Sequence, residues 1–397
     1  MKICLAKSTL GTPGHLVWEE GGGYTWVRDV PEDAWIFGSP GCCFDLSELA
    51  HAQGGTHTWE PPKAHHRSLT ELLGEDGDHL HVRWDLILPP ALYKKQLQDL
   101  LQRSQELLKN SDEWKYQETF ERTQKTLCDL APVTVDRMAL GIHLRTCPEG
   151  RKDELRSFQG DKQARYTRTT STGRLTVSSG PKLLTLDKRF RNILKSRHGD
   201  QGSIIQLDYV SLEPRTLLAL TGQEAPDDVY DILQSRTGAM ARDKLKRATM
   251  LVLYGGGIGS LRKILDPGED PVKIMDGIRE AFKLRYLGDT LTAEHSVSGM
   301  LTNFYGRVMH PKRAQPGYLV AMYTQSTAVD VALQGFGQIR EEIKDIDGID
   351  AVGIVHDALW LDVHHSCAGY TERLREVGST IPGFDIRFPL DEQHVSN

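Results

Sequence analysis

Two aspartates stand where apolar segments with the composition of buried strands end or are interrupted. Asp208 follows the apolar residues 203–207 (SIIQL), and Asp357 lies within the apolar run of residues 353–361 (GIVHDALWL). A buried carboxylate usually has a cation or a metal as its partner, and carboxylate oxygens suit hard divalent cations. The simpler alternatives are a helix N-cap for Asp208, which is the commoner reading of that residue alone, and a hairpin-turn aspartate for Asp357.

Four side chains of a segment between these aspartates recur at intervals of four residues: Arg242, Lys246, Met250 and Tyr254. On a helix this spacing puts all four on one slowly winding face. Two cations, an apolar stem and an aromatic ring are what a nucleoside triphosphate needs for its phosphates and its base. The alternative is a surface helix with a basic face.

Positive charge is concentrated in residues 151–197, although the chain has a formal net charge of −6. This segment holds thirteen Lys or Arg and four Asp or Glu. Such an excess indicates contacts with phosphates, and a solvated basic surface is the alternative. Together with the cationic helix and the two aspartates, the segment favours phosphoryl transfer supported by two metal ions.

The elements that would position these residues alternate between strand and helix patterns. We expect a strand over 203–207, two strands around a tight turn at His356 and Asp357, and an irregular or hairpin-like region over 150–200. Residues 1–90 are typical of short strands and loops, and the leucine spacing over 91–130 predicts two helices. Further helices are expected over residues 212–220, 227–234, 239–254, 271–287 and 317–343. Without a βαβ rhythm, the pattern predicts an α+β fold.

Length and composition restrict the class of protein. The 397 residues suffice for two or three domains, and no apolar run has the length of a membrane span. The first ten residues do not have the pattern of a signal peptide. The six cysteines form no CxxC pair, so we expect reduced thiols in a cytoplasmic protein and no zinc site. The protein is also expected to be a monomer.

At these residues the chain resembles the family A DNA polymerases, the bacterial repair and phage replicative type. Five motifs of that family have counterparts here, in the family's order, over roughly residues 165–363. The family motif DYSQIELR corresponds to DYVSLEPR (208–215), and VHDE corresponds to VHDA (355–358). The helix motif R-x3-K-x7-YG corresponds to Arg242, Lys246, Tyr254 and Gly255. The motifs T-x-TGRL and QGTAAD correspond to TSTGRL (170–175) and QSTAVD (325–330).

The resemblance implies a role for each matched residue. Asp208 and Asp357, with the Tyr209 carbonyl, would bind two Mg²⁺ ions, for which Mn²⁺ can substitute. Arg242 and Lys246 would hold the triphosphate of a dNTP, and Lys246 would also protonate the leaving pyrophosphate.

Other matched residues would contact the sugar, the base pair and the DNA. Glu213 would be the steric gate that excludes a ribose 2′-hydroxyl, and Met250 and Tyr254 would lie near the nascent base pair. The residues expected to contact primer–template DNA are Arg174, Arg307, Gln325 and His356.

Three residues depart from the family pattern. Ala358 stands where the family has glutamate, Met250 stands where it usually has Phe or Tyr, and Pro214 follows Glu213 within the first turn of the expected helix, where proline is tolerated. Met250 and Ala358 are similar to residues of the phage-type single-subunit RNA polymerases, which lack a gate glutamate. A DNA-synthesising enzyme is therefore expected first, an RNA-synthesising or primase-like polymerase second, and a non-catalytic DNA-binding protein with a degenerate polymerase fold third.

The resemblance also implies a right-hand architecture, with an antiparallel palm sheet and helical fingers and thumb. It assigns residues 91–150 to the thumb, 151–225 and 301–397 to the palm and 226–300 to the fingers, and leaves the role of 1–90 open. The acids Asp45 and Glu48 do not have the DxE spacing of the family's proofreading exonuclease. The expectation is a short, exonuclease-less enzyme of a phage or mobile element, with an unidentified replisome or processivity partner.

Overall fold

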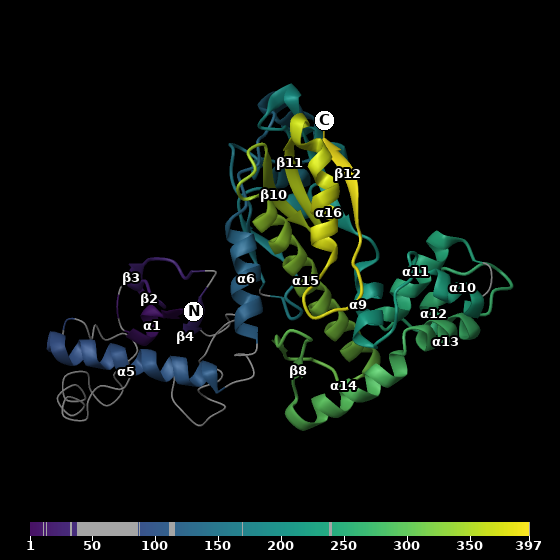
Figure 1. The fold of residues 1–397 in the computed structure, drawn as a ribbon, viewed down its shortest axis with the longest axis horizontal. Coiled ribbons are helices and arrows are strands. Elements are labelled where there is room, and N and C mark those ends of the chain that lie inside the picture. Colours follow the sequence, from purple (N-terminus) through teal and green to yellow (C-terminus); the bar gives the residue numbers. More distant parts are fainter. Residues whose placement is uncertain are drawn as a thin grey trace. The chain divides into compact units, whose positions relative to one another are not determined.

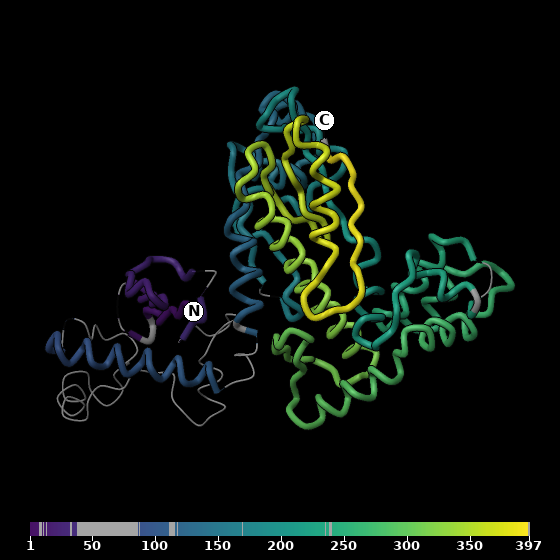
Figure 2. Tube along the Cα trace, viewed as in Figure 1, coloured from purple at the N-terminus to yellow at the C-terminus, as the bar shows by residue number. Residues whose placement is uncertain are grey.

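A computed structural model describes residues 1–10, 12, 14–31, 34–37, 86, 88–110, 116–168, 170–237 and 240–396. The chain divides into two compact units, Met1–Gln124 and Lys125–Asn397. Figure 1 labels the elements and Figure 2 traces the chain through them. Sheets and helices are mixed without a regular alternation, which confirms the predicted α+β class.

The first unit contains a small mixed sheet. Its strands lie in the order β3 (Gly23–Val27), β2 (His15–Glu19), β1 (Lys2–Leu5) and β4 (Trp35–Phe37), and β1 is antiparallel to β2 but parallel to β4. The short helix α1 (Lys7–Leu10) follows β1. The long helix α5 (Pro90–Lys109) packs against β1. These strands agree with the pattern predicted for residues 1–90, whereas Asp45 and Glu48 lie outside the described residues.

A four-stranded antiparallel sheet forms the centre of the second unit. Its order is β10 (Ile349–Val355), β11 (Ala358–His364), β7 (Gly202–Tyr209) and β12 (Leu390–Ser396). The long helix α15 (Pro316–Ile343) and helix α16 (Thr371–Ser379) pack against each other and over this sheet (Figure 1). Their apolar side chains and those of the strands form one continuous core.

Six helices build a second core in the same unit. They are α9 (Leu212–Leu220), α10 (Asp231–Thr237), α11 (Arg242–Leu253), α12 (Ile258–Leu261), α13 (Pro271–Ala281) and α14 (Leu284–Ser298). Helix α15 belongs to both cores, because its residues up to Met322 pack among these helices and those from Ala328 onward pack against the sheet.

Shorter elements surround the sheet. Helices α6 (Gln117–Cys128), α7 (Arg137–Thr146) and α8 (Glu149–Arg156) precede the hairpin of β5 (Arg165–Thr167) and β6 (Thr176–Ser179), and three 3₁₀ turns follow it. A second hairpin, β8 (Leu301–Thr302) and β9 (Val308–Met309), leads into α15. The region over residues 150–200, predicted to be irregular or hairpin-like, contains the β5–β6 hairpin together with most of α8 and the 3₁₀ turns.

The helix predicted over residues 271–287 is wrong in its extent. Two helices, α13 and α14, occupy this stretch, because Lys283 adopts a left-handed conformation with φ of 48° and turns the chain between them. Cys4, Cys128, Cys147 and Cys367 are free thiols, and Cys42 and Cys43 lie outside the described residues. Among the helices of the described ranges, none is both long and apolar enough to cross a membrane.

Candidate active site

Asp208 and Asp357 meet at one end of the central sheet. Asp208 is the penultimate residue of β7, and Asp357 lies in the two-residue turn between β10 and β11. The register pairs Asp208 with Ala358, the residue directly after Asp357, and the Tyr209 amide donates a hydrogen bond to the Asp357 carbonyl at 3.1 Å. Antiparallel pairing therefore brings together two aspartates that are 149 positions apart in the chain.

Burial and neighbouring carboxylates oppose the ionisation of Asp208 and Asp357. Burial raises the pKa of Asp208 to about 7, and the charges of Asp357 and Asp391 act in the same direction, whereas Lys246 lowers it. Burial also raises the pKa of Asp357, and the charge of Glu213 adds to that effect. Two partly buried, mutually repelling carboxylates form a site that a cation would stabilise.

Two residues beside these aspartates have unusual backbone conformations. Ser211 has φ 55° and ψ 48°, and it turns the chain from β7 into α9. His356 has φ 58° in the turn that presents Asp357. Left-handed conformations cost free energy for residues other than glycine and concentrate at functional sites. Two of the three that occur among the described residues flank Asp208 and Asp357, which directs attention to this end of the sheet.

The side chain of Tyr209 is fixed by contacts within the protein. Its hydroxyl donates to the Gly378 carbonyl at 2.7 Å, and its ring packs against Phe336. A Cβ on Gly335 would lie 1.8 Å from the Tyr209 hydroxyl oxygen, so the close approach of α15 requires glycine there. Because the side chain is buried, only the Tyr209 backbone is available to the predicted metal site.

Helix α11 carries the four residues predicted to contact a nucleotide. Lys246 is exposed, and it lowers the pKa of both Asp208 and Asp357, which places its charge near the two carboxylates. Arg242 pairs with Asp228 and lies over the Tyr230 ring, 5.3 Å from its centroid. Met250 is partly buried against the helical core, and Tyr254 ends the helix with its side chain 44% exposed.

A cavity of about 300 Å³ adjoins Asp357. Its polar lining consists of residues that the sequence singled out: Arg174, Glu213, Tyr254, Gln325, His356 and Asp357. The apolar wall comes largely from α15, including Ala328, Ala332 and Phe336. Residues predicted from five separate motifs thus surround one space.

Hydrogen bonds join the polar groups of this cavity. The Tyr254 hydroxyl donates to Glu213 Oε1 at 2.7 Å, and Arg174 Nη2 donates to the same oxygen at 3.1 Å and to the Tyr254 hydroxyl at 2.9 Å. When the Gln325 side-chain amide is oriented so that both its ends are satisfied, its oxygen accepts from Arg174 Nε at 3.2 Å and Nη2 at 3.1 Å, and its nitrogen donates to Thr172 Oγ1 at 2.8 Å. The Glu213 carboxylate is consequently held in one orientation beside Asp357.

Arg307 stands apart from the other predicted DNA-contacting residues. Its guanidinium is buried and pairs with the fully buried Asp330, whereas Arg174, Gln325 and His356 line the cavity. Contact of DNA with Arg174, Gln325 and His356 stays a prediction, and the burial of Arg307 favours an indirect role for that residue.

The basic segment of residues 151–197 offers less free charge than its composition indicates. Seven of its thirteen cations form ion pairs with acids: Arg151, Lys152, Arg156, Arg168, Arg174, Arg189 and Arg197. An eighth, Arg191, lies 5.1 Å from the centroid of the Trp360 ring. Ion pairs with neighbouring acids thus occupy part of the positive charge of this segment, and its contact with phosphates stays a prediction.

Sequence reasoning missed Asp391. This residue lies on β12, directly opposite Asp208 in the register, and its charge acts on the Asp208 carboxyl. Residues 390–396 (LDEQHVS) are too polar for a strand to be predicted from hydrophobicity. The only apolar residues of this segment, Leu390 and Val395, stand five positions apart, so it shows no apolar–polar alternation.

The oxygen donors at the sheet end suit Mg²⁺ or Mn²⁺ in type. Carboxylates and backbone carbonyls are the ligands these cations prefer, and the repulsion between Asp208 and Asp357 would be relieved by a cation. Within the described residues, no group of three or more His, Cys, Asp or Glu side chains is arranged to hold a metal ion. A cation here would therefore depend on the two aspartates, the backbone and groups of a bound substrate.

Comparisons with known proteins identify a similar fold. No protein-family model and no curated protein match the sequence. The POL domain of Pol1 from M. smegmatis, solved in complex with DNA primer-template and dNTP, superimposes with a TM-score of 0.50 at 16% sequence identity. The fold of this chain resembles that of a DNA polymerase domain. The similarity covers 88% of this chain, which spans 63% of the length of that structure.

Proposed function

We propose that this protein is a template-directed DNA polymerase that adds dNTPs to a primer 3′-hydroxyl. The observation that carries the proposal is the meeting of Asp208 and Asp357 at the sheet end, with Lys246 of α11 acting on both. The fold supports it, because the similar POL domain was solved with DNA primer-template and dNTP.

The proposed subdomains follow from the position of the site. The central sheet with α15 and α16 would be the palm (151–225 and 301–397), and helices α10 to α14 would be the fingers (226–300). These helices share one hydrophobic core with α9 and the first turns of α15, which joins them to the central sheet. Residues 91–150 would be the thumb, and the role of residues 1–90 is open.

Asp208, Asp357 and the Tyr209 carbonyl would hold Mg²⁺ or Mn²⁺. When bound, these ions would activate the primer 3′-hydroxyl and neutralise charge on the triphosphate. Lys246 would bind a phosphate and donate a proton to the departing pyrophosphate. Arg242 would bind the triphosphate in competition with Asp228, its present partner.

Glu213 favours deoxynucleotides over ribonucleotides in this proposal. The Tyr254 hydroxyl and the Arg174 guanidinium hold its carboxylate rigidly beside the cavity, where it would collide with a ribose 2′-hydroxyl. Arg174, Gln325 and His356 would contact the primer–template duplex on the same side. Met250 would pack against the base of the incoming nucleotide.

Primer extension on one defined template, with dNTPs or rNTPs and with Mg²⁺ or Mn²⁺, tests the proposal. We expect extension with dNTPs and its loss in Asp208→Ala, whereas Asp345→Ala, an exposed aspartate after α15, keeps it. Extension that persists in Asp208→Ala contradicts the assignment, and equal use of rNTPs or synthesis without a primer favours the RNA-synthesising alternative. Binding of primer–template without extension under either metal favours the non-catalytic one. The absence of proofreading predicts that the primer is not shortened when dNTPs are omitted.

A further inference from the structure

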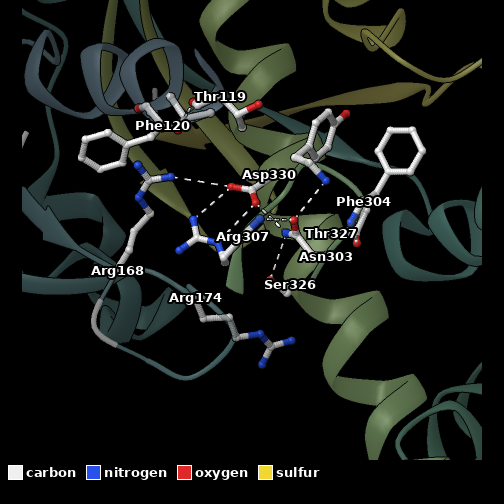
Figure 3. A network of polar contacts seen from close by, with 12 residues as sticks. Thr119, Phe120, Arg168, Arg174, Asn303, Phe304, Arg307, Ser326, Thr327 and Asp330 are labelled. Atoms are coloured by element: carbon white, nitrogen blue, oxygen red, sulfur yellow. Dashed lines mark hydrogen bonds and ion pairs between the residues drawn. The ribbon is translucent and has the colours of Figure 1, made fainter. Parts of the chain in front are cut away.

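A buried ion-pair network lies next to the loop that carries Arg174 (Figure 3). Asp330 of α15 is fully buried, and Arg307 donates to its two carboxylate oxygens through Nη2 at 3.1 Å and Nε at 3.3 Å. Asn303 Nδ2 donates to Asp330 at 2.8 Å, and Arg168 Nη1 lies 3.6 Å from it. A buried carboxylate with this many donors is held firmly in place.

The β8–β9 hairpin fixes the backbone of Arg307 as well as its side chain. The Arg307 amide donates to Asn303 Oδ1 at 2.9 Å, and the Asn303 amide donates to the Arg307 carbonyl at 2.8 Å. Asn303 also donates to Ser326 Oγ of α15 at 3.1 Å. The guanidinium of Arg307 therefore has little freedom to turn toward a ligand.

Gly173 rests directly on the Arg307 guanidinium. A Cβ at Gly173 would lie 2.7 Å from Arg307 Cζ and 2.9 Å from Nη1. Gly173 also has φ of +74°, a conformation that favours glycine, so two independent reasons require glycine immediately before Arg174. Arg307 thus supports the turn from below at van der Waals distance.

Hydrogen bonds hold the same turn from its sides. The Gly173 amide donates to the Thr170 carbonyl at 2.9 Å, and Thr170 Oγ1 donates to the Arg174 carbonyl at 3.0 Å. Thr172 Oγ1 accepts from the Gln325 amide of α15 at 2.8 Å. Only the Arg174 side chain extends from this turn to the cavity, where it contacts Glu213 and Tyr254.

We infer that Arg307 is a positioning residue, which sets the orientation of Arg174 by supporting the turn at Gly173, and that it does not itself contact DNA. The importance of this orientation for primer extension rests on the proposed function. The geometric claim does not, because it concerns contacts within the protein.

The first test uses the protein alone, without DNA or nucleotide. Arg174 Nε donates to Gln325, so its Nε–H group should give a protected signal in ¹⁵N-edited NMR spectra, and Arg174→Ala identifies that signal. Arg307→Lys keeps a positive charge beside Asp330 but removes the planar surface under Gly173. We expect this variant to lose two signals, its own and that of Arg174.

Arg340→Lys is the matched control. It makes the same replacement in an ion-paired arginine of α15, whose partners are Asp129 and Glu341, and should lose only its own signal. Loss of only the Arg307 signal in Arg307→Lys overturns the inference. If that variant folds poorly, Gly173→Ala tests the same contact from the other side, and an unchanged Arg174 signal there also overturns it.

The second test uses a primer whose terminal purine lacks the minor-groove N3 acceptor. If Arg174 donates to that atom, the modified primer slows the wild type by about 10- to 150-fold, the range for a hydrogen bond from a charged donor. Arg174→Ala, Arg307→Lys and the double variant should show equal rates on both primers and equal losses on the ordinary one. If the modified primer slows Arg307→Lys as much as it slows the wild type, the inference that Arg307 positions Arg174 is contradicted. Loss of the Arg174 signal without any extension by the wild type would instead contradict the proposed function alone.

Discussion

Asp391 of β12 lies directly opposite Asp208 of β7, so the two side chains share one face of the sheet. On the other side of Asp208, the register places Ala358. Ala358, Asp208 and Asp391 therefore lie side by side on the neighbouring strands β11, β7 and β12. The carboxylate next to Asp208 in this row is that of Asp391, and it lies on β12, the strand that the sequence pattern did not predict. The charge of Asp391 raises the pKa of Asp208.

Replacing Asp391 by asparagine should move the acidic limb of the activity profile to lower pH. Without the charge of Asp391, Asp208 ionises at lower pH, and the ionised form is the one that would bind Mg²⁺. Primer-extension rates between pH 5.5 and 8.5 at saturating Mg²⁺ measure the limb. Glu392→Gln is the control, because the neighbouring side chain points to the other face of the sheet. A limb that stays in place or moves to higher pH contradicts the prediction.

Asp208→Asn should stabilise the metal-free protein at alkaline pH. The pKa of Asp208 is raised to about 7 in the folded state, so the native state binds more protons than the unfolded state between about pH 4 and pH 7. The contribution of Asp208 to the free energy of unfolding is therefore fully present below about pH 4 and is lost as the pH rises through 7. The thermal midpoint, measured in EDTA, should be similar for both proteins at pH 4.5 and higher for the variant at pH 8.

Added Mg²⁺ should reverse that order at pH 8 by stabilising only the wild type. Asp345→Asn controls for the general loss of a negative charge. A variant that is less stable than the wild type in EDTA at pH 8 would show that Asp208 has a favourable partner in the protein.

Glu213→Ala should relax the choice of sugar. The carboxylate that would collide with a 2′-hydroxyl is removed, and rejection by a pocket of fixed size amounts to about 10- to 200-fold. The measurement is the ratio of single-turnover rates for dNTP and rNTP on one template. Tyr254→Phe keeps the ring but loses the hydrogen bond that orients Glu213, so an intermediate ratio is expected. An unchanged ratio in Glu213→Ala would place the gate elsewhere.

Asp228→Ala should tighten dNTP binding. Asp228 pairs with Arg242 on the exposed face of α11, where it competes with a triphosphate. An exposed ion pair contributes at most about 1 kcal/mol, which corresponds to an affinity gain of about fivefold or less. Equilibrium titration with a non-hydrolysable dNTP at low salt measures the change. Arg242→Ala should weaken binding, and weaker binding by Asp228→Ala would show that Asp228 orients Arg242 for the nucleotide.

The elements that carry the site could be predicted because their patterns are local. The apolar run before Asp208 and the two runs around His356 and Asp357 are strands β7, β10 and β11, and the helix predicted over 212–220 is α9. The spacing of Arg242, Lys246 and Tyr254 predicts the helix α11, which Tyr254 caps, and the charge of Lys246 on this helix lowers the pKa of Asp208.

What could not be predicted depends on tertiary contacts. Strand β12 pairs with β7 although its sequence is polar, and Lys283 breaks a helix through its backbone conformation. The burial of Arg307 follows from the position of Asp330 on a distant helix, and a sequence motif shows only that an arginine is present. The ion pairs that occupy the basic segment are likewise invisible to a count of charges.

Helix α15 has a consequence for how the second unit responds to thermal fluctuation. Its first turns complete the core of helices α9 to α14, and its later turns complete the core of the sheet. Between them lie Thr324, Ser326 and Thr327, which are buried but polar. Neither core can open fully without releasing the helix that closes the other, so the two should unfold in one cooperative transition. Amide protons in the middle of α15 should accordingly exchange with solvent only when the whole unit unfolds, while those of the exposed turns exchange through local opening.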